Sequence, residues 1–107
     1  MSETKTLTVY RGDYGYNLSW TLKNADGTAF TLTGYTVKFK VWPLGKPSQL
    51  LVNGTCDPVN ENAGTLTYTV AQNDFLETGQ FLAEFEATKT GYIESFNSFT
   101  LIVKESP

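Results

Sequence analysis

Residues 35–42, Tyr35-Thr36-Val37-Lys38-Phe39-Lys40-Val41-Trp42, alternate apolar and polar side chains as far as Val41. Neighbouring side chains of a β-strand point to opposite faces, so this period of two predicts a strand with one buried face and one solvated face. The alternation recurs on both sides, at Leu18-Ser19-Trp20-Thr21-Leu22, Leu66-Thr67-Tyr68-Thr69-Val70 and Phe81-Leu82-Ala83-Glu84-Phe85-Glu86-Ala87. The sequence therefore predicts an all-β fold, an immunoglobulin-like antiparallel β-sandwich of about seven strands.

Turn-forming residues set the ends of the predicted strands. Asp26-Gly27 supplies the positive-φ geometry of a tight turn, and Pro43 stops one strand because proline cannot donate to a central ladder. We predict strands at residues 5–10, 15–23, 35–42, 49–56, 65–70, 80–88 and 92–104. The whole chain, residues 1–107, is predicted to be one domain, because 107 residues is a usual size for one.

Two stretches interrupt the alternation. Residues 71–78 predict one short helical turn, whose Phe75 and Leu76 would close one end of the sandwich. Phe96 is out of phase with the apolar residues that begin at Phe99, which predicts a bulge or bend between the two.

The residue inventory excludes several classes of function. A net charge of −3 provides no basic surface for nucleic acid. The absence of histidine excludes Ser-His-Asp and Cys-His catalysis and His-based metal sites. Glu84 and Glu86 lie on one face of a predicted strand, which indicates a solvated face rather than a catalytic pair across a cleft. We therefore predict no enzyme activity, no metal and no cofactor.

The sequence also bears on the compartment. Residues 1–5 are polar and lack the apolar core of a signal peptide, and no run approaches the roughly 20 apolar residues of a membrane span. Cys56 is the single cysteine, so no disulfide can form within the chain, and we expect Cys56 to be a small buried hydrophobe. These features predict a protein that is made and folds inside the cell, with no membrane partner.

Short motifs have structural interpretations. Arg11-Gly12-Asp13 matches an integrin-binding triplet, but without a secretion signal we interpret it as a turn after the first strand. Asn17-Leu18-Ser19 and Asn53-Gly54-Thr55 fit the glycosylation pattern, and for the same reason we expect neither to be used. The Asn53-Gly54 pair is interpreted as a turn or bulge.

The order of the turn motifs is informative beyond fold class. Along the chain these motifs are Arg11-Gly12-Asp13, Asn24-Ala25-Asp26-Gly27-Thr28, Leu32-Thr33-Gly34-Tyr35-Thr36-Val37, Ala63-Gly64-Thr65-Leu66, Asn73-Asp74-Phe75-Leu76 and Thr78-Gly79-Gln80-Phe81. In this order and spacing the chain resembles the N-terminal domain of the phage baseplate upper protein family and related phage immunoglobulin-like proteins. The resemblance covers about residues 6–103.

The resemblance implies a structural role in a phage virion, with synthesis in the host cytoplasm. It implies a tail, baseplate or capsid-surface component that acts through contacts with other virion proteins or with itself. In the baseplate protein a linker and an attachment region for the receptor-binding protein follow this domain. The resemblance does not extend to that region, so its attachment function is not carried over.

A surplus of apolar side chains indicates how such a module would act. A sandwich core needs one face of each strand, yet several apolar residues have the opposite phase from their strand's core set: Tyr10, Trp42, Leu51, Leu82 and Ile102. A contiguous apolar patch marks an interface, and tyrosine and tryptophan are frequent contact anchors. We predict that these residues form a contact with another virion protein or with a second copy in a homo-oligomer.

Two other functions are consistent with the residues. Tyr14, Tyr16 and Tyr92 lie near strand ends and, with Trp42, could stack on sugar rings, which would make the chain a host-surface carbohydrate-binding module. A third interpretation is an intracellular domain that modulates a host protein during infection. Trp20 is expected in the core, because it is in phase with two leucines of its strand.

Overall fold

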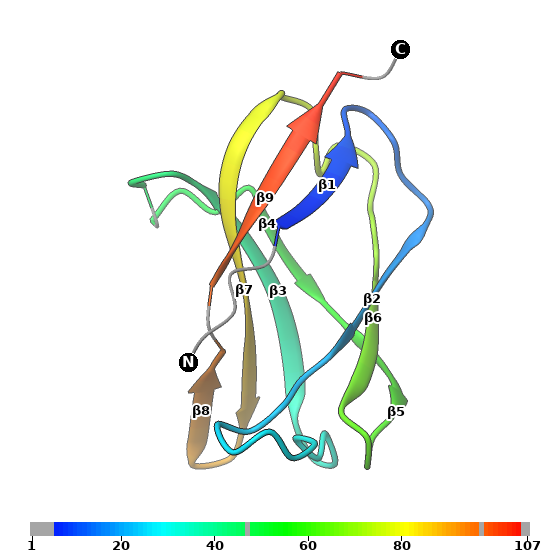
Figure 1. The fold of residues 1–107 in the computed structure, drawn as a ribbon, viewed down its shortest axis with the longest axis vertical. Helices are drawn as coiled ribbons and strands as arrows, with labels where there is room; N and C mark the ends of the chain where they lie inside the picture. Colours follow the sequence, from blue (N-terminus) through cyan, green and yellow to red (C-terminus); the bar gives the residue numbers. More distant parts are fainter. Residues whose placement is uncertain (1–5, 47, 97, 106–107) are drawn as a thin grey trace.

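The computed structural model describes residues 6–46, 48–96 and 98–105. Within these ranges the chain forms two β-sheets and no helix (Figure 1). The strands are β1 (Thr6–Tyr10), β2 (Asn17–Thr21), β3 (Thr36–Pro43), β4 (Val52–Thr55), β5 (Asp57–Asn60), β6 (Thr65–Thr69), β7 (Gly79–Lys89), β8 (Tyr92–Ser95) and β9 (Phe99–Lys104). None of the described segments is a helix that is long and apolar enough to cross a bilayer. The all-β prediction is confirmed.

The two sheets have the strand order of an immunoglobulin fold. The six-stranded sheet has the order β1-β9-β7-β3-β4, with β8 also paired to β7, and the three-stranded sheet has the order β2-β6-β5. The sets β9-β7-β3 and β2-β6-β5 correspond to strands G-F-C and B-E-D of immunoglobulin domains. The alternating stretch of residues 35–42 therefore lies mainly in β3, in the interior of the larger sheet.

One pairing departs from the predicted antiparallel arrangement. β1 runs parallel to β9, with Thr6 opposite Thr100 and Tyr10 opposite Lys104. The other strand pairs of the described residues are antiparallel. A period of two is the same for either strand direction, so alternation alone could not predict this pairing.

One strand was not predicted, and one predicted strand is divided. The predicted strand at 49–56 is shortened to β4, which pairs with β3; the chain then crosses at buried Cys56 to β5, which lies in the other sheet where a polar turn was expected. The predicted strand at 92–104 becomes β8 and β9, which both pair with β7. The interruption lies between Ser95 and Phe99, where a bulge or bend was predicted, and Asn97 lies outside the described residues.

The predicted helical turn at residues 71–78 is wrong. The backbone N–H of Asp74 donates to the carbonyl of Ala71 (3.1 Å), which closes a single turn. Asn73 has a φ of 76°, in the left-handed region that cannot continue a right-handed helix. Phe75 is buried and closes one end of the sandwich as predicted, whereas Leu76 is exposed.

The inward side chains of both sheets form one aromatic-rich core. The ring of Phe39 lies 5.1 Å from that of Tyr68 across the sandwich and 5.2 Å from that of Phe85 on the next strand. Half-buried Trp20 stacks on Phe99 with 4.6 Å between ring centroids, which agrees with its predicted packing role. Rings at these separations stabilise the core beyond simple burial of their area.

Candidate interaction surface

Several of the off-phase apolar residues lie together on the outer face of the six-stranded sheet. Trp42 of β3 is directly opposite Leu82 of β7. Leu82 is opposite Thr100 and Ile102 is opposite Gln80, so Leu82 and Ile102 are diagonal neighbours on β7 and β9. Diagonal cross-strand neighbours are about 7–8 Å apart, within reach of long side chains.

Tyr10 extends this row onto the edge strand. It is opposite Lys104, while Thr8 is opposite Ile102, so Tyr10 is diagonal to Ile102. We call this row across β3, β7, β9 and β1 the apolar band; it consists of Tyr10, Trp42, Leu82 and Ile102. Each member follows a buried core residue in its strand and points to the opposite, outer side. The sequence prediction thus names residues that the fold brings together.

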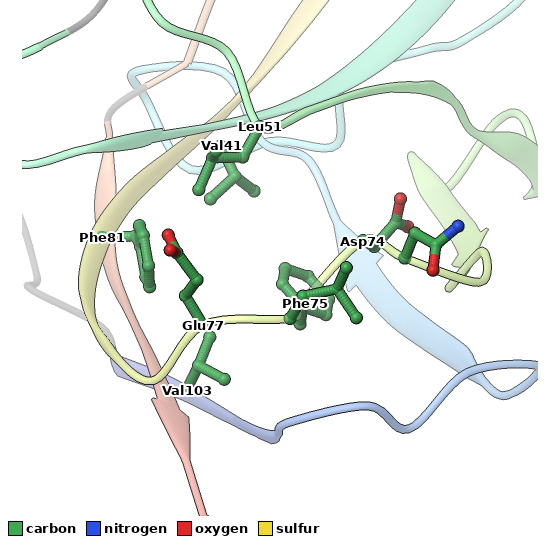
Figure 2. A pocket seen from close by; sticks show the side chains of 9 residues that line it. Val41, Leu51, Asp74, Phe75, Glu77, Phe81 and Val103 are labelled. Atoms are coloured by element: carbon green, nitrogen blue, oxygen red, sulfur yellow. The ribbon is translucent and has the colours of Figure 1, made fainter.

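Leu51, the remaining residue of the predicted contact, does not join the apolar band. It precedes β4 and its N–H donates to the carbonyl of Val41 (2.8 Å). Its side chain instead lines a pocket at the end of the sandwich, beside Val41 and Phe81 (Figure 2). The reason is its position outside the strand, where the alternation of faces no longer determines side-chain direction.

The outer face has a second, charged part on the same strands. Lys40 is opposite Glu84 and Lys38 is opposite Glu86, and we call these residues the charged band. Lys40 Nζ and Glu86 Oε1 form an ion pair at 3.0 Å, with about a fifth of each side chain exposed. Burial raises the pKa of Glu84, the like charge of Glu86 adds to this, and Lys40 opposes it. The charged band thus contains one ion pair within the chain, between Lys40 and Glu86.

The structure separates the tyrosines of the carbohydrate-binding interpretation. Tyr14 and Tyr16 lie between β1 and β2 at one end of the sandwich, and Tyr92 begins β8 at the opposite end (Figure 1). Tyr14 is 56% exposed and Tyr92 62%, whereas Tyr16 is half-buried against the core. Tyr92 lies instead beside Lys89, whose Nζ is 5.0 Å from the ring centroid. No common stacking platform is formed by these tyrosines.

Arg11-Gly12-Asp13 forms the predicted turn. Gly12 has a φ of 84°, and its N–H donates to the carbonyl of Phe75 (2.8 Å). The N–H of Asp13 donates to the carbonyl of Tyr10 (3.2 Å), and the Arg11 side chain pairs with Glu105. The triplet thus holds the loop between β6 and β7 against β1, and the Arg11 side chain is engaged by Glu105.

The predicted turn or bulge at Asn53-Gly54 is wrong. Both residues lie in regular pairing of β4, and Gly54 is opposite Phe39 on the inward side. A Cβ on Gly54 would be 2.2 Å from the Tyr68 ring, so glycine is required by the close approach of this ring. The sequence contains no local signal for this packing, because Gly54 and Tyr68 belong to different sheets.

Tyr68 links the core to the loop 71–78, where a helical turn was predicted. Its hydroxyl donates to Asp74 Oδ2 (2.5 Å), and the N–H of Ala71 donates to the same oxygen (2.8 Å). Burial raises the pKa of Tyr68 above its ordinary value, and the hydrogen bond to Asp74 adds to this. The loop is therefore fastened by a partly buried, charge-assisted bond.

The reactive groups considered for catalysis or metal binding are the Cys56 thiol and the carboxylates. Burial raises the pKa of the Cys56 thiol to about 12, with Asp57 adding to the effect, so Cys56 is a thiol at neutral pH. Among the described residues no three Cys, Asp or Glu side chains cluster as metal ligands.

Two solved structures share the fold of this chain. The N-terminal domain of phage TP901-1 ORF48 superimposes with a TM-score of 0.71 at 16% identity, covering 94% of this chain and 86% of that chain. CopC from Methylosinus trichosporium OB3b is more distant, with a TM-score of 0.53 at 12% identity, covering 95% and 86%. At these identities both likenesses concern the fold alone. No curated protein sequence matches the chain.

The family comparison covers nearly the whole chain. Residues 3–107 match the model of the BppU N-terminal domain, the N-terminal domain of the phage baseplate upper protein. The match agrees with the resemblance found in the turn motifs, and it supports a structural role in a phage tail or baseplate and a place in the virion. The chain belongs to the BppU N-terminal domain family of phage baseplate proteins.

Proposed function

We propose that this chain is a baseplate or tail component that binds a neighbouring virion protein through the apolar band. The observation that carries the proposal is the continuity of Tyr10, Trp42, Leu82 and Ile102 across four adjacent strands of one sheet. Family membership supports the structural role. The residues of the apolar band indicate which surface of the chain would make the contact.

The chemistry of the apolar band favours protein contact. Tyrosine and tryptophan anchor interfaces because they bury large area with few rotatable bonds and keep one polar group for a hydrogen bond. The adjoining ion pair between Lys40 and Glu86 supplies a polar border, as interface rims usually have. A face with an apolar centre and a charged border is typical of a binding surface rather than of a purely solvated sheet.

The partner is another virion protein or a second copy of this chain, and the mass of the purified protein in solution distinguishes the two. A discrete closed oligomer at several concentrations would assign the apolar band to a self-contact. A monomer at every concentration would assign it to a different virion protein.

The experiment changes two residues of the apolar band and leaves the core residues unchanged. The double variant Trp42→Ser/Ile102→Lys should fold but lose incorporation into particles or oligomers by at least about tenfold, since hot-spot truncations commonly cost 2 kcal/mol or more. The control Val59→Ser, an exposed apolar residue of β5 in the other sheet, should assemble normally. Unchanged incorporation of the first variant would exclude the apolar band as the contact.

A further inference from the structure

The end of the sandwich contains a pocket that the proposed contact does not use. It has a volume of about 330 Å³ and lies between the start of β4, the loop 71–78 and the ends of β7 and β9 (Figure 2). Its walls include the core residues Val41, Phe75 and Phe81. Exposed Leu51 and Leu76 form part of its lining. This volume is at the lower end of the roughly 300–1,000 Å³ of small-molecule sites, which suits one large side chain.

The wall of the end pocket formed by loop 71–78 is held in place by the rest of the molecule. The carbonyl of Phe75 accepts a hydrogen bond from Gly12 (2.8 Å). One carboxylate oxygen of Asp74 accepts bonds from the Tyr68 hydroxyl and the Ala71 N–H. A wall fastened at two points needs little ordering when a ligand enters, which favours binding.

The ionisable groups of the end pocket are all acidic. The ionisable residues of its lining are Asp74 and Glu77. Asp74 is engaged by Tyr68, whereas Glu77 has no hydrogen bond or ion pair with any described residue. The Glu77 side chain extends from the loop into the space between Phe75 and Phe81 (Figure 2). A ligand that fills this pocket therefore meets apolar walls and one unpaired carboxylate.

We propose that the end pocket binds a segment of a neighbouring virion protein that inserts one large apolar side chain and places an adjacent lysine or arginine on Glu77. The apolar side chain would cover Val41, Phe75 and Phe81, and the cation would neutralise the unpaired carboxylate. The identification of the ligand as a protein segment rests on the proposed assembly function, while the pocket is separate from the apolar band.

The test measures binding of capped tetrapeptides to the isotope-labelled protein by NMR. The probe Ac-Gly-Leu-Lys-Gly-NH2 is compared with Ac-Gly-Leu-Glu-Gly-NH2 and Ac-Gly-Ser-Lys-Gly-NH2 at millimolar concentrations. The Leu-Lys peptide should shift the amide signals of residues 41, 51, 73–77, 81 and 103. Its affinity should exceed that of the Leu-Glu peptide by roughly two- to fivefold, as expected for one partly exposed charge pair.

Variants assign the preference to Glu77. Glu77→Gln should bind both leucine peptides equally, whereas the control Glu94→Gln, on exposed β8 away from the pocket, should keep the preference for lysine. The absence of pocket shifts with every peptide would overturn the site, and equal binding of the leucine peptides by the unmodified protein would overturn the ligand class. If either of these results overturns the pocket proposal while the Trp42→Ser/Ile102→Lys variant still fails to assemble, the proposed function of the apolar band is unaffected.

Discussion

The apolar band and the charged band lie on the same outer face, and both include residues of β3 and β7. They differ in what their outward side chains contact: charged partners in one band, water in the other. In the charged band, Lys40 pairs with Glu86 and faces Glu84 across the strands. In the apolar band, Trp42 faces Leu82 and the row continues to Ile102, on the side of the sheet that faces away from the second sheet.

This difference separates stability from binding. An outward charged pair can be complete in the free protein, so it needs nothing from a partner. An outward apolar row remains partly in water, and covering it releases free energy of roughly 25 cal/mol per Å² of apolar area. The alternation of side chains places both bands on the outer face. Only the chemical type of the side chains, apolar or charged, distinguishes a binding surface from a paired one.

The sharpest test of this separation compares an inward and an outward aromatic residue of β3. Phe39→Ala should lower the free energy of unfolding by about 3–5 kcal/mol, because Phe39 is buried among other core rings. Trp42→Ala should lower it by less than about 2 kcal/mol, because its side chain already contacts solvent. Urea unfolding measures both. Equal losses would show that Trp42 has a core role instead.

The next effect concerns the contact between the two sheets. Gly54→Ala should destabilise the protein by about 1–3 kcal/mol, because the new Cβ would meet the Tyr68 ring, whose hydroxyl is fastened to Asp74. Thr55→Ala, an exposed change in the same strand, is the control. Thermal unfolding compares them, and a Gly54→Ala variant as stable as the control would contradict the close packing.

A smaller effect is expected in the charged band. Lys40→Ala should cost at most about 1 kcal/mol, since the pair with Glu86 is near the surface and screened by salt. The loss should shrink when urea unfolding is repeated in 1 M salt. A loss that does not depend on salt would show that the aliphatic part of Lys40, rather than its charge, supports the sheet.

The smallest effect depends on pH. The folded-state pKa of Glu84 is raised above 4.5, so its favourable contribution is complete below the unfolded-state pKa and is lost as the pH rises through the folded-state pKa. Glu84→Gln should therefore be slightly more stable than the parent at pH 7, and the gain should vanish near pH 4. A gain that persists at pH 4 would contradict the raised pKa. Glu94→Gln should change little at either pH.

Much of the fold could be predicted because alternation is a local property. Residues 36–43 and 79–89, which became β3 and β7, were predicted to within a residue at each end. The pairing of β1 with β9 and the crossing between sheets at Cys56 could not, because both depend on contacts between distant segments. The left-handed Asn73 likewise ended an expected helical turn in a way that composition does not reveal.

The candidate surface was predictable to a similar extent. Wrong-phase apolar residues inside strands, such as Trp42 and Leu82, came together because strand phase determines the face. The prediction that Leu51 joins this surface was wrong, because Leu51 lies outside a strand and alternation there does not determine the direction of its side chain. The end pocket was missed because its lining comes from several segments, although the prediction that Phe75 closes one end pointed to its position.

Hydroxyl-radical footprinting of the free protein and of purified virions tests most directly whether the apolar band is covered in the assembled particle. Trp42 and Tyr10 should be oxidised much more slowly in the virion, while Tyr92, exposed at the opposite end of the sandwich, provides the internal reference. Equal oxidation of Trp42 in both samples, relative to Tyr92, would show that the apolar band stays exposed to solvent and would contradict its role as the contact.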